Sequence, residues 1–258
     1  MPICAPNSIV TIVWPRTDMR PWFGVALLIG AIPILTTKAA AAPDLSADLA
    51  TEERRHGLGW SQGRASIRTS LGVPVGPSLR FDASATALRD SRRHGGADAV
   101  VDLSGDWSES LGAVQVDASL IGHLFTGARG RQDYAEAQIG ARTLIGPADF
   151  DLSASYAPSQ HAIGGDHLYL AARSRLAVIG TPFTLSAALG HSSGDVKDPV
   201  RAARLRPGGA YTDWQLGADY VRNRFTLGLF YIGTDIAAAD CAAGHCGDTV
   251  IGRLGVRF

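Results

Sequence analysis

Apolar and polar residues alternate along most of the chain. In residues 97–107, 112–125 and 147–157, apolar side chains fall on one face of an extended chain and polar ones on the other. This period of two predicts half-buried strands, and after residue 46 no segment has a convincing helical period. A shift of one residue would exchange the two faces, so the pattern also defines the register.

The alternation predicts twelve strands, and the connections between them differ in length. The expected strands cover 47–58, 64–74, 78–88, 97–107, 112–125, 132–144, 147–157, 166–177, 182–191, 211–222, 224–235 and 248–258. Connections after even-numbered strands are short, whereas those after odd-numbered strands are longer and polar, with "WSQG" after the first strand as the exception. Short turns on one rim and long loops on the other are typical of outer-membrane barrels. The predicted fold is an all-β, transmembrane, antiparallel up-and-down β-barrel of about 12 strands.

Three features favour a membrane barrel over a soluble β-sandwich, which also has one apolar face. The apolar face is lean, dominated by Ala and Leu. Large aromatic residues lie mostly near strand ends, as an interfacial girdle requires; they are Trp60, Phe81, Trp107, Phe125, Tyr134, Phe150, Tyr156, Phe183, Trp214 and Phe225. Charges of both signs occur inside the strands, where a polar lumen accommodates them. The candidate pore-lining residues are Asp98, Asp102, Asp117, His123, Glu136, Arg142, Arg173, Arg175, Asp219 and Arg253.

The chain ends in "VIGRLGVRF", an alternating strand that continues to an aromatic residue. In a closed barrel the last strand pairs with the first, because lipid tolerates no open sheet edge. Lipid-facing side chains are expected at Val250, Leu254, Val256 and Phe258. A terminal Phe in such a pattern also resembles the signal by which the outer-membrane insertion machinery recognises its substrates.

The first 41 residues have the layout of a cleavable signal peptide: arginines, an apolar run from Trp22 to Leu35, and small residues at Ala39–Ala42. The apolar run is shorter than the roughly 20 residues that a membrane helix needs. We therefore expect a signal peptide over 1–41, starting at Met1 or Met19, and a barrel over 42–258.

Charge excludes one class of partner. Residues 1–41 contain three of the 24 basic and one of the 24 acidic residues, so 21 basic and 23 acidic residues remain, a net charge near −2. Nucleic-acid binding calls for a concentrated basic face, so no nucleic-acid partner is expected.

Two of the three cysteines follow the apolar run, in "DCAAGHCGD". In an exported protein, Cys241 and Cys246 are expected to form a small loop disulfide. A metal site with His245 is the alternative, but its ligand spacing is unusual. No metal and no cofactor are therefore expected.

Catalytic motifs give no positive signal. The chain has no Gly-rich phosphate loop with its Lys, no H-E-x-x-H pair and no G-x-S-x-G elbow. His123 is interpreted as a lumen histidine with ordinary hydrogen bonds, although a Ser–His pair near the rim is the alternative. The basic loop with Arg201, Arg204 and Arg206 leaves three interpretations open: contact with lipopolysaccharide, inward folding that narrows the pore, or a solvated loop.

Several phrases resemble one family. They are "SYAP", "GGDHLYL" and "GTPFTLSAALGHSSGD" between residues 155 and 195, "YTDWQLGADYVRNRFTLGLFYIGTD" at 211–235, and the terminal "VIGRLGVRF". They are similar to the TorF-type porin family, also called Gcw_chp. The opening "RRHGLGWSQGRASIRTSLGVPVG" is a looser match, because that family tends to show a Tyr-Arg-Phe-Arg-Gly phrase there. The resemblance implies an outer-membrane channel and supplies no catalytic residues.

The leading hypothesis is a passive outer-membrane channel for small polar solutes or ions, in contact with lipid and lipopolysaccharide. The mixed charge of the predicted lumen argues against strong selectivity for one sign. A closed-lumen outer-membrane barrel with a structural or hydrolase role is the second hypothesis. A soluble exported β-sandwich or adhesin is the third.

Overall fold

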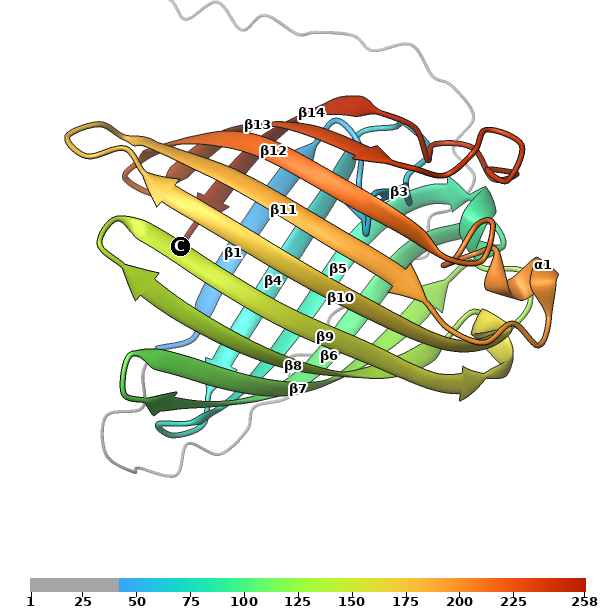
Figure 1. Ribbon diagram of the computed structural model, residues 1–258, viewed down its shortest axis with the longest axis horizontal. Helices are drawn as coiled ribbons and strands as arrows, with labels where there is room; N and C mark the ends of the chain where they lie inside the picture. Colours follow the sequence, from blue (N-terminus) through green and yellow to red (C-terminus); the bar gives the residue numbers. More distant parts are fainter. Residues whose placement is uncertain (1–41) are drawn as a thin grey trace, which may run out of the picture. The chain divides into compact units, whose positions relative to one another are not determined.

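Residues 42–258, the part that the computed structural model describes, form a closed barrel of twelve antiparallel strands (Figure 1). The barrel strands are β1 (Asp44–Ala50), β4 (Ser66–Pro74), β5 (Leu79–Ser91), β6 (Ala97–Leu111), β7 (Val114–Thr126), β8 (Tyr134–Ile145), β9 (Ala148–Gln160), β10 (Gly165–Ala177), β11 (Phe183–Ser193), β12 (Tyr211–Arg222), β13 (Phe225–Thr234) and β14 (Thr249–Arg257). Each pairs with its neighbours in chain order, and β1 closes the ring by pairing with β14. The predicted fold class is confirmed; the expected signal peptide lies outside the described residues.

The short elements all belong to connections at one end of the barrel. They are β2 (Arg54–Arg55), β3 (Leu58–Gly59), η1 (Arg92–His94), η2 (His161–Ile163) and α1 (Pro199–Ala202). Within residues 42–258, no helix has the length and apolar character needed to cross a bilayer.

The two ends of the barrel differ as the connection lengths predict. Tight turns such as Gly112–Ala113 lie at the left in Figure 1, and the long connections lie at the right. Ser46 pairs with Arg257, so β1 starts beside the chain's last residues at the left. We call these the turn end and the loop end.

The outer surface of the barrel is apolar and uncovered. Leu120 on β7, Leu152 on β9 and Leu229 on β13 are each 60% or more exposed. Six of the aromatic residues expected in a girdle are exposed on this surface: Phe81, Trp107, Phe150, Tyr156, Phe183 and Phe225. A surface of this kind is suited to lipid, because contiguous apolar patches of this size are rare on soluble monomers.

Three other expected girdle residues, Trp60, Phe125 and Tyr134, lie inside instead. All three belong to the apolar cluster at the loop end of the lumen. Position near a strand end does not distinguish an aromatic residue at the membrane interface from one that faces inward. The alternation along β7 and β8 does, because it places Phe125 and Tyr134 on the same face as His123 and Glu136.

The first predicted strand, 47–58, is wrong in its second half. β1 ends at Ala50, which pairs with both Arg253 and Ser66, and residues 51–65 leave the wall and fold into the barrel. We call residues 51–65 the inner segment. Outward positions of β1 are odd-numbered, so a longer strand would present Glu53 and Arg55 to lipid, at a cost of several kcal/mol. The connection after β1 is therefore long, as on the rest of that rim.

Candidate functional site: the lumen of the barrel

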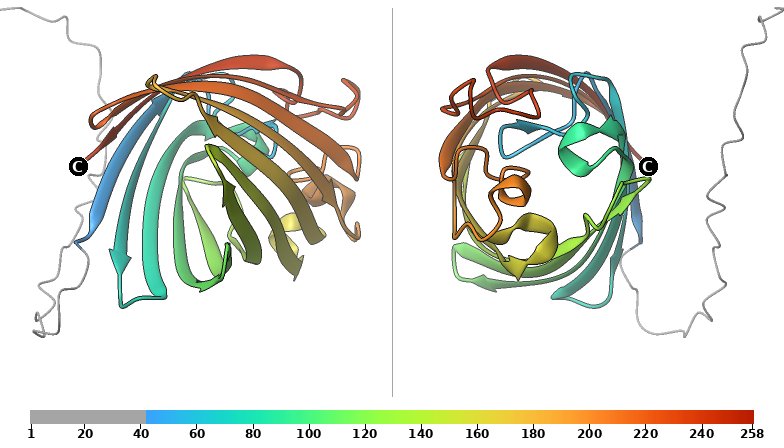
Figure 2. Two further views of the ribbon diagram at one scale, coloured as in Figure 1. Left: turned by 60° about the vertical axis from the view of Figure 1, so that its left-hand side comes forward. Right: turned by 90° about the vertical axis from the view of Figure 1, so that its right-hand side faces the viewer.

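The inner segment fills much of the lumen at the loop end. Seen from that end, it lies with η1, η2 and α1 inside the circle of strands (Figure 2). Side chains from these connections and from the wall form one buried cluster: Leu58, Trp60, Leu88, Ala97, Val100, Tyr134, Ala157, Ile163, Leu205, Tyr211 and Cys246. This half of the barrel is thus packed like a protein interior.

Ion pairs join the inner segment to the wall. Arg55 donates two hydrogen bonds to the carboxylate of Asp102 on β6, at 2.7 and 3.2 Å. Its guanidinium also bonds Glu53 at 3.1 Å and lies 4.4 Å from the ring centre of Trp60. Glu53 in turn pairs with Arg68 on β4. A buried bidentate pair of this kind specifies one orientation of the inner segment.

The network continues across two further strands. The Nδ1 of His123 on β7 lies 2.8 Å from Oδ1 of Asp102, and its Nε2 lies 3.5 Å from Oε1 of Glu136 on β8. His123 therefore takes part in the hydrogen-bonded wall network, between two carboxylates. Arg55 connects this network to the inner segment.

A second contact fixes the other side of the inner segment. The ring of His56 stacks on Tyr169 of β10, with ring centres 3.6 Å apart. Tyr211 donates to the carbonyl of His56 at 2.9 Å, and Tyr169 donates to Asp213 at 3.2 Å. His56 has a φ of +49°, a left-handed conformation that turns the chain back at this point.

Buried arginines complete the packing at the loop end. Arg93 and Arg204 are each 5% exposed, and Arg206 is 1% exposed. Arg93 donates to carbonyls, including those of Gly59 at 3.2 Å and Arg204 at 3.2 Å. Burial lowers the pKa of Arg93 and of Arg204 to about 10. Even so, both remain charged at neutral pH.

These contacts decide between the interpretations of the basic loop. Arg204 donates from Nε to His94 Nδ1 at 2.8 Å, and its guanidinium lies over the ring of Phe125. Arg204 and Arg206 are thus folded inward and buried rather than solvated. Arg201 is different, because it is exposed and pairs with Asp198 at 3.0 Å.

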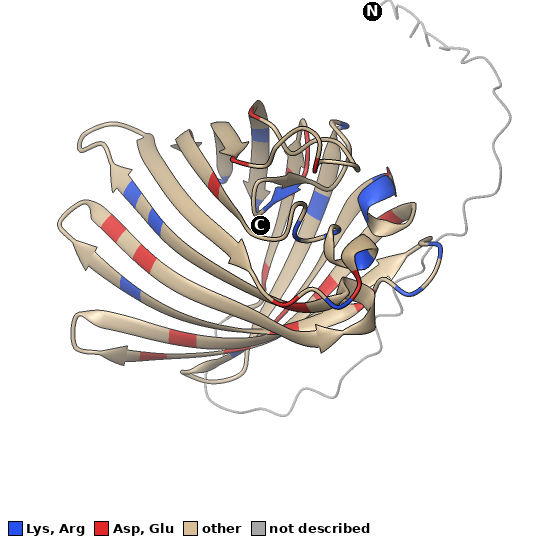
Figure 3. Cartoon of the chain, turned by 45° about the vertical axis from the view of Figure 1, so that its right-hand side comes forward, with Lys and Arg blue, Asp and Glu red and all other residues tan. Residues whose placement is uncertain are grey.

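Charged residues of both signs lie on the barrel strands toward the turn end (Figure 3), and several of them form ion pairs. The largest group borders a cavity of about 390 Å³ and includes Arg142, Asp149, Asp151, Arg173, Arg175, Asp219 and Arg253. Opposite charges on different strands pair: Arg173 of β10 with Asp151 of the neighbouring β9 at 3.1 Å, and Arg253 of β14 with Asp219 of β12, across β13, at 3.1 Å. Arg142 and Arg175 both pair with Asp149. The arginine side chains remain 40–58% exposed, so they face solvent in the lumen.

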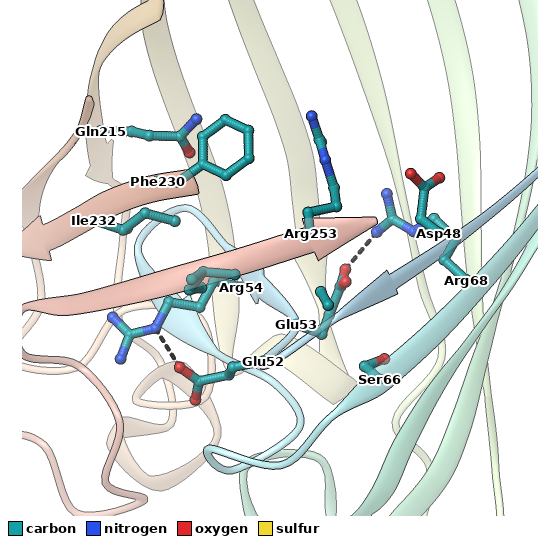
Figure 4. A pocket seen from close by; sticks show the side chains of 12 residues that line it. Asp48, Glu52, Glu53, Arg54, Ser66, Arg68, Gln215, Phe230, Ile232 and Arg253 are labelled. Atoms are coloured by element: carbon teal, nitrogen blue, oxygen red, sulfur yellow. Dashed lines mark hydrogen bonds and ion pairs between the residues drawn. The ribbon is translucent and has the colours of Figure 1, made fainter. Parts of the chain in front are cut away.

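Two further cavities border the inner segment itself. The first, of about 160 Å³, lies between Glu52, Glu53 and Arg54 and the wall residues Phe230 and Arg253 (Figure 4). The second, of about 430 Å³, is lined by Arg54 and Arg55 of the inner segment, and by wall residues that include Asp82, Asp102 and His123. The inner segment is therefore the boundary between the packed loop end and the open turn end.

The structure separates the predicted pore-lining residues into three groups. Asp102, His123 and Glu136 contact the inner segment or its network. The turn-end cavity is bordered by Arg142, Arg173, Arg175, Asp219 and Arg253. Asp117 lies on the inward face of β7. Asp98 lies at the loop end of β6 and is exposed.

Residues that the sequence interpretation missed carry several of these contacts. Asp149 and Asp151 occupy the polar face of a recognised alternating segment, so the same signal could have found them. Glu53 and Arg55 were assigned to a strand, and Asp213 carries no local signal for its contact with Tyr169.

The structure places the residues of two further predictions, the last strand and the cysteine pair. Val250, Leu254 and Phe258 are exposed on the outer surface, Val256 is half-buried there, and the Phe258 amide donates to the Leu45 carbonyl at 2.9 Å. Cys241 and Cys246 are joined by a disulfide. Residues 42–258 hold no group of three or more His, Cys, Asp or Glu placed to bind a metal ion.

Three solved structures with a similar fold are outer-membrane porins or channels. The KdgM porin matches with a TM-score of 0.54 and 5% identity over 83% of this chain and 98% of that one. The NanC porin matches with a TM-score of 0.54 and 12% identity over 84% and 99%. An outer-membrane channel from Pseudomonas putida F1 matches with a TM-score of 0.54 and 12% identity over 86% and 97%.

At these identities the similarity establishes the barrel fold alone. No curated protein matches the chain. Its sequence, however, matches over residues 37–251 the model of a family described as "Bacterial protein of unknown function (Gcw_chp)". The chain is therefore a member of the Gcw_chp family.

Proposed function

We propose that this protein is a passive outer-membrane channel for small polar solutes or ions, of the TorF type within its family. The observation that carries the proposal is the turn-end lumen, where solvent-exposed ion pairs border a cavity of about 390 Å³, and a further cavity of about 430 Å³ lies between the inner segment and the wall. Paired charges of both signs keep the turn-end lumen hydrated and give it little overall preference for anions or cations. The porin fold of the similar structures supports the same function.

In this proposal the turn end faces the periplasm, and the loop end faces lipopolysaccharide. Residues 1–41 act as the signal peptide, and the insertion machinery recognises the strand that ends in Phe258. The inner segment limits the size of the solute, because it occupies the lumen between β6 and β10.

A closed barrel with a structural role is the second candidate, favoured by the burial of Leu58 and Trp60 to 3% exposure or less. A hydrolase has less support. The His167 and Ser192 side chains are 2.8 Å apart, but they are only 2% and 0% exposed, so no substrate reaches that pair.

Single-channel recording of refolded residues 42–258 in planar bilayers tests the proposal. Discrete conductance steps in KCl, with a reversal potential near zero across a salt gradient, are the expected result. Absence of steps over a range of voltages and salt concentrations would favour the closed barrel.

A further inference from the structure

A small disulfide-closed loop lies directly on the inner segment. It consists of residues 241–246, which we call the disulfide loop, in the connection between β13 and β14. Cys246 is 1% exposed and belongs to the same buried cluster as Leu58 and Trp60. The loop is thus part of the packing that keeps the inner segment inside the barrel.

Direct contacts hold the inner segment against this loop. The amide of Gly59 donates to the carbonyl of His245 at 2.8 Å, and Arg54 donates to the carbonyl of Gly247 at 2.8 Å. The Nδ1 of His245 also lies 3.4 Å from a carboxylate oxygen of Glu52. All three contacts depend on the path of the backbone between Cys241 and the start of β14.

Arg93 of η1 contacts both the inner segment and the disulfide loop. Its guanidinium donates to the carbonyl of Gly59 at 3.2 Å and to the carbonyl of Gly244 at 3.0 Å. The same group lies 3.3 Å from Sγ of Cys246. A buried cation that relies on backbone carbonyls loses much of its stabilisation if those carbonyls move.

We propose that the disulfide loop is a redox-sensitive closure of the channel. With Cys241 and Cys246 bonded, the loop presents its carbonyls to Arg93 and Gly59 and keeps the inner segment in the lumen. When the bond is reduced, residues 242–245 lose that constraint, and the inner segment leaves the lumen toward the loop end. The inference rests on the proposed channel function and adds its regulation.

The chemical step needs an external dithiol. A thiolate of the dithiol attacks Sγ of Cys241, which is half-buried, and forms a mixed disulfide while Cys246 leaves as a thiolate and takes a proton. The second thiol of the dithiol then displaces Cys241. The dithiol ends as a cyclic disulfide, and the protein ends with two thiols, a two-electron reduction.

Dithiothreitol added to the folded, bilayer-inserted protein tests the closure. We expect larger conductance steps or a higher open probability, reversed when the thiols are reoxidised. The variant Cys241→Ser/Cys246→Ser is expected to behave like the reduced protein and to ignore dithiothreitol. Unchanged conductance of the wild-type protein after confirmed reduction would overturn the inference.

Hydrogen exchange separates this inference from the channel function. In detergent micelles, reduction is expected to accelerate exchange of the Gly59 and Trp60 amides about tenfold, while amides of β8 and β9 keep their rates. If neither the wild-type protein nor a variant lacking residues 52–64 conducts, the channel proposal fails. Exchange at Gly59 that is unaffected by reduction refutes the closure, whatever the conductance.

Discussion

Replacement of Arg55 by Met tests how the inner segment is held. Arg55 forms a bidentate pair with Asp102, and the two side chains are 14% and 16% exposed. The Met side chain keeps the contact with Trp60 but leaves the Asp102 carboxylate without its cation, next to His123. We expect the inner segment to open much more often in this variant.

The magnitude follows from the burial of the pair. Removal of one partner from a buried ion pair costs about 3 to 5 kcal/mol, because the other charge is left uncompensated. We take about 3 kcal/mol, since Asp102 keeps its hydrogen bond to His123 at 2.8 Å. That is about a hundredfold increase in the population of the open form.

Hydrogen exchange at the Gly59 and Trp60 amides measures this population, and single-channel recording gives the accompanying rise in open probability. The double variant Arg55→Met/Asp102→Asn leaves neither charge unpaired and is expected to exchange more slowly than Arg55→Met alone. Arg175→Met is the matched control, because Arg175 is 58% exposed and does not contact the inner segment. Exchange in Arg55→Met within about twofold of wild type would show that the Arg55–Asp102 pair does not hold the inner segment in the lumen.

Three other predictions concern pH, ion selectivity and assembly. Burial lowers the pKa of His94 well below its ordinary value, so the packing that contains it loses stability as pH falls below about 6.5; lower protection factors of the inner-segment amides at pH 5 than at pH 7.5, each corrected for the intrinsic exchange rate at that pH, check this, and equal protection factors contradict it. Arg173→Glu/Arg175→Glu makes the turn-end lumen acidic and is expected to shift the reversal potential toward cation preference; an unchanged reversal potential would mean that ions do not pass these side chains. Deletion of Phe258 is expected to lower the amount of heat-modifiable barrel in outer-membrane fractions, and wild-type amounts would show that this residue is not needed for assembly.

Alternation was sufficient to predict the wall of the barrel. Eleven of the twelve predicted strands overlap the observed ones closely, because each strand has lipid on one side and a polar lumen on the other. The same rule explains the one wrong boundary. Glu52 to Arg55 form a run of four charges, and a run of charges breaks the alternation that a lipid-facing strand requires.

The inner segment could not be predicted in the same way. Its position depends on contacts between residues far apart in the chain, such as Arg55 with Asp102 and His56 with Tyr169. Such contacts leave no local period in the sequence. Once the segment is known to leave the wall, the charges of the inner segment and the inward-facing strand position of Tyr134 explain why the inner segment and Tyr134 are buried together.

The most direct test of the account is the conductance of the protein with and without its inner segment. Ala50 pairs with Ser66, so an Asn-Gly hairpin turn with short flanks can replace residues 52–64 without altering β1 or β4. We expect clearly larger conductance steps for this variant than for wild type, measured in the same bilayers and salt. Steps of equal size, or no steps from either protein, would contradict it.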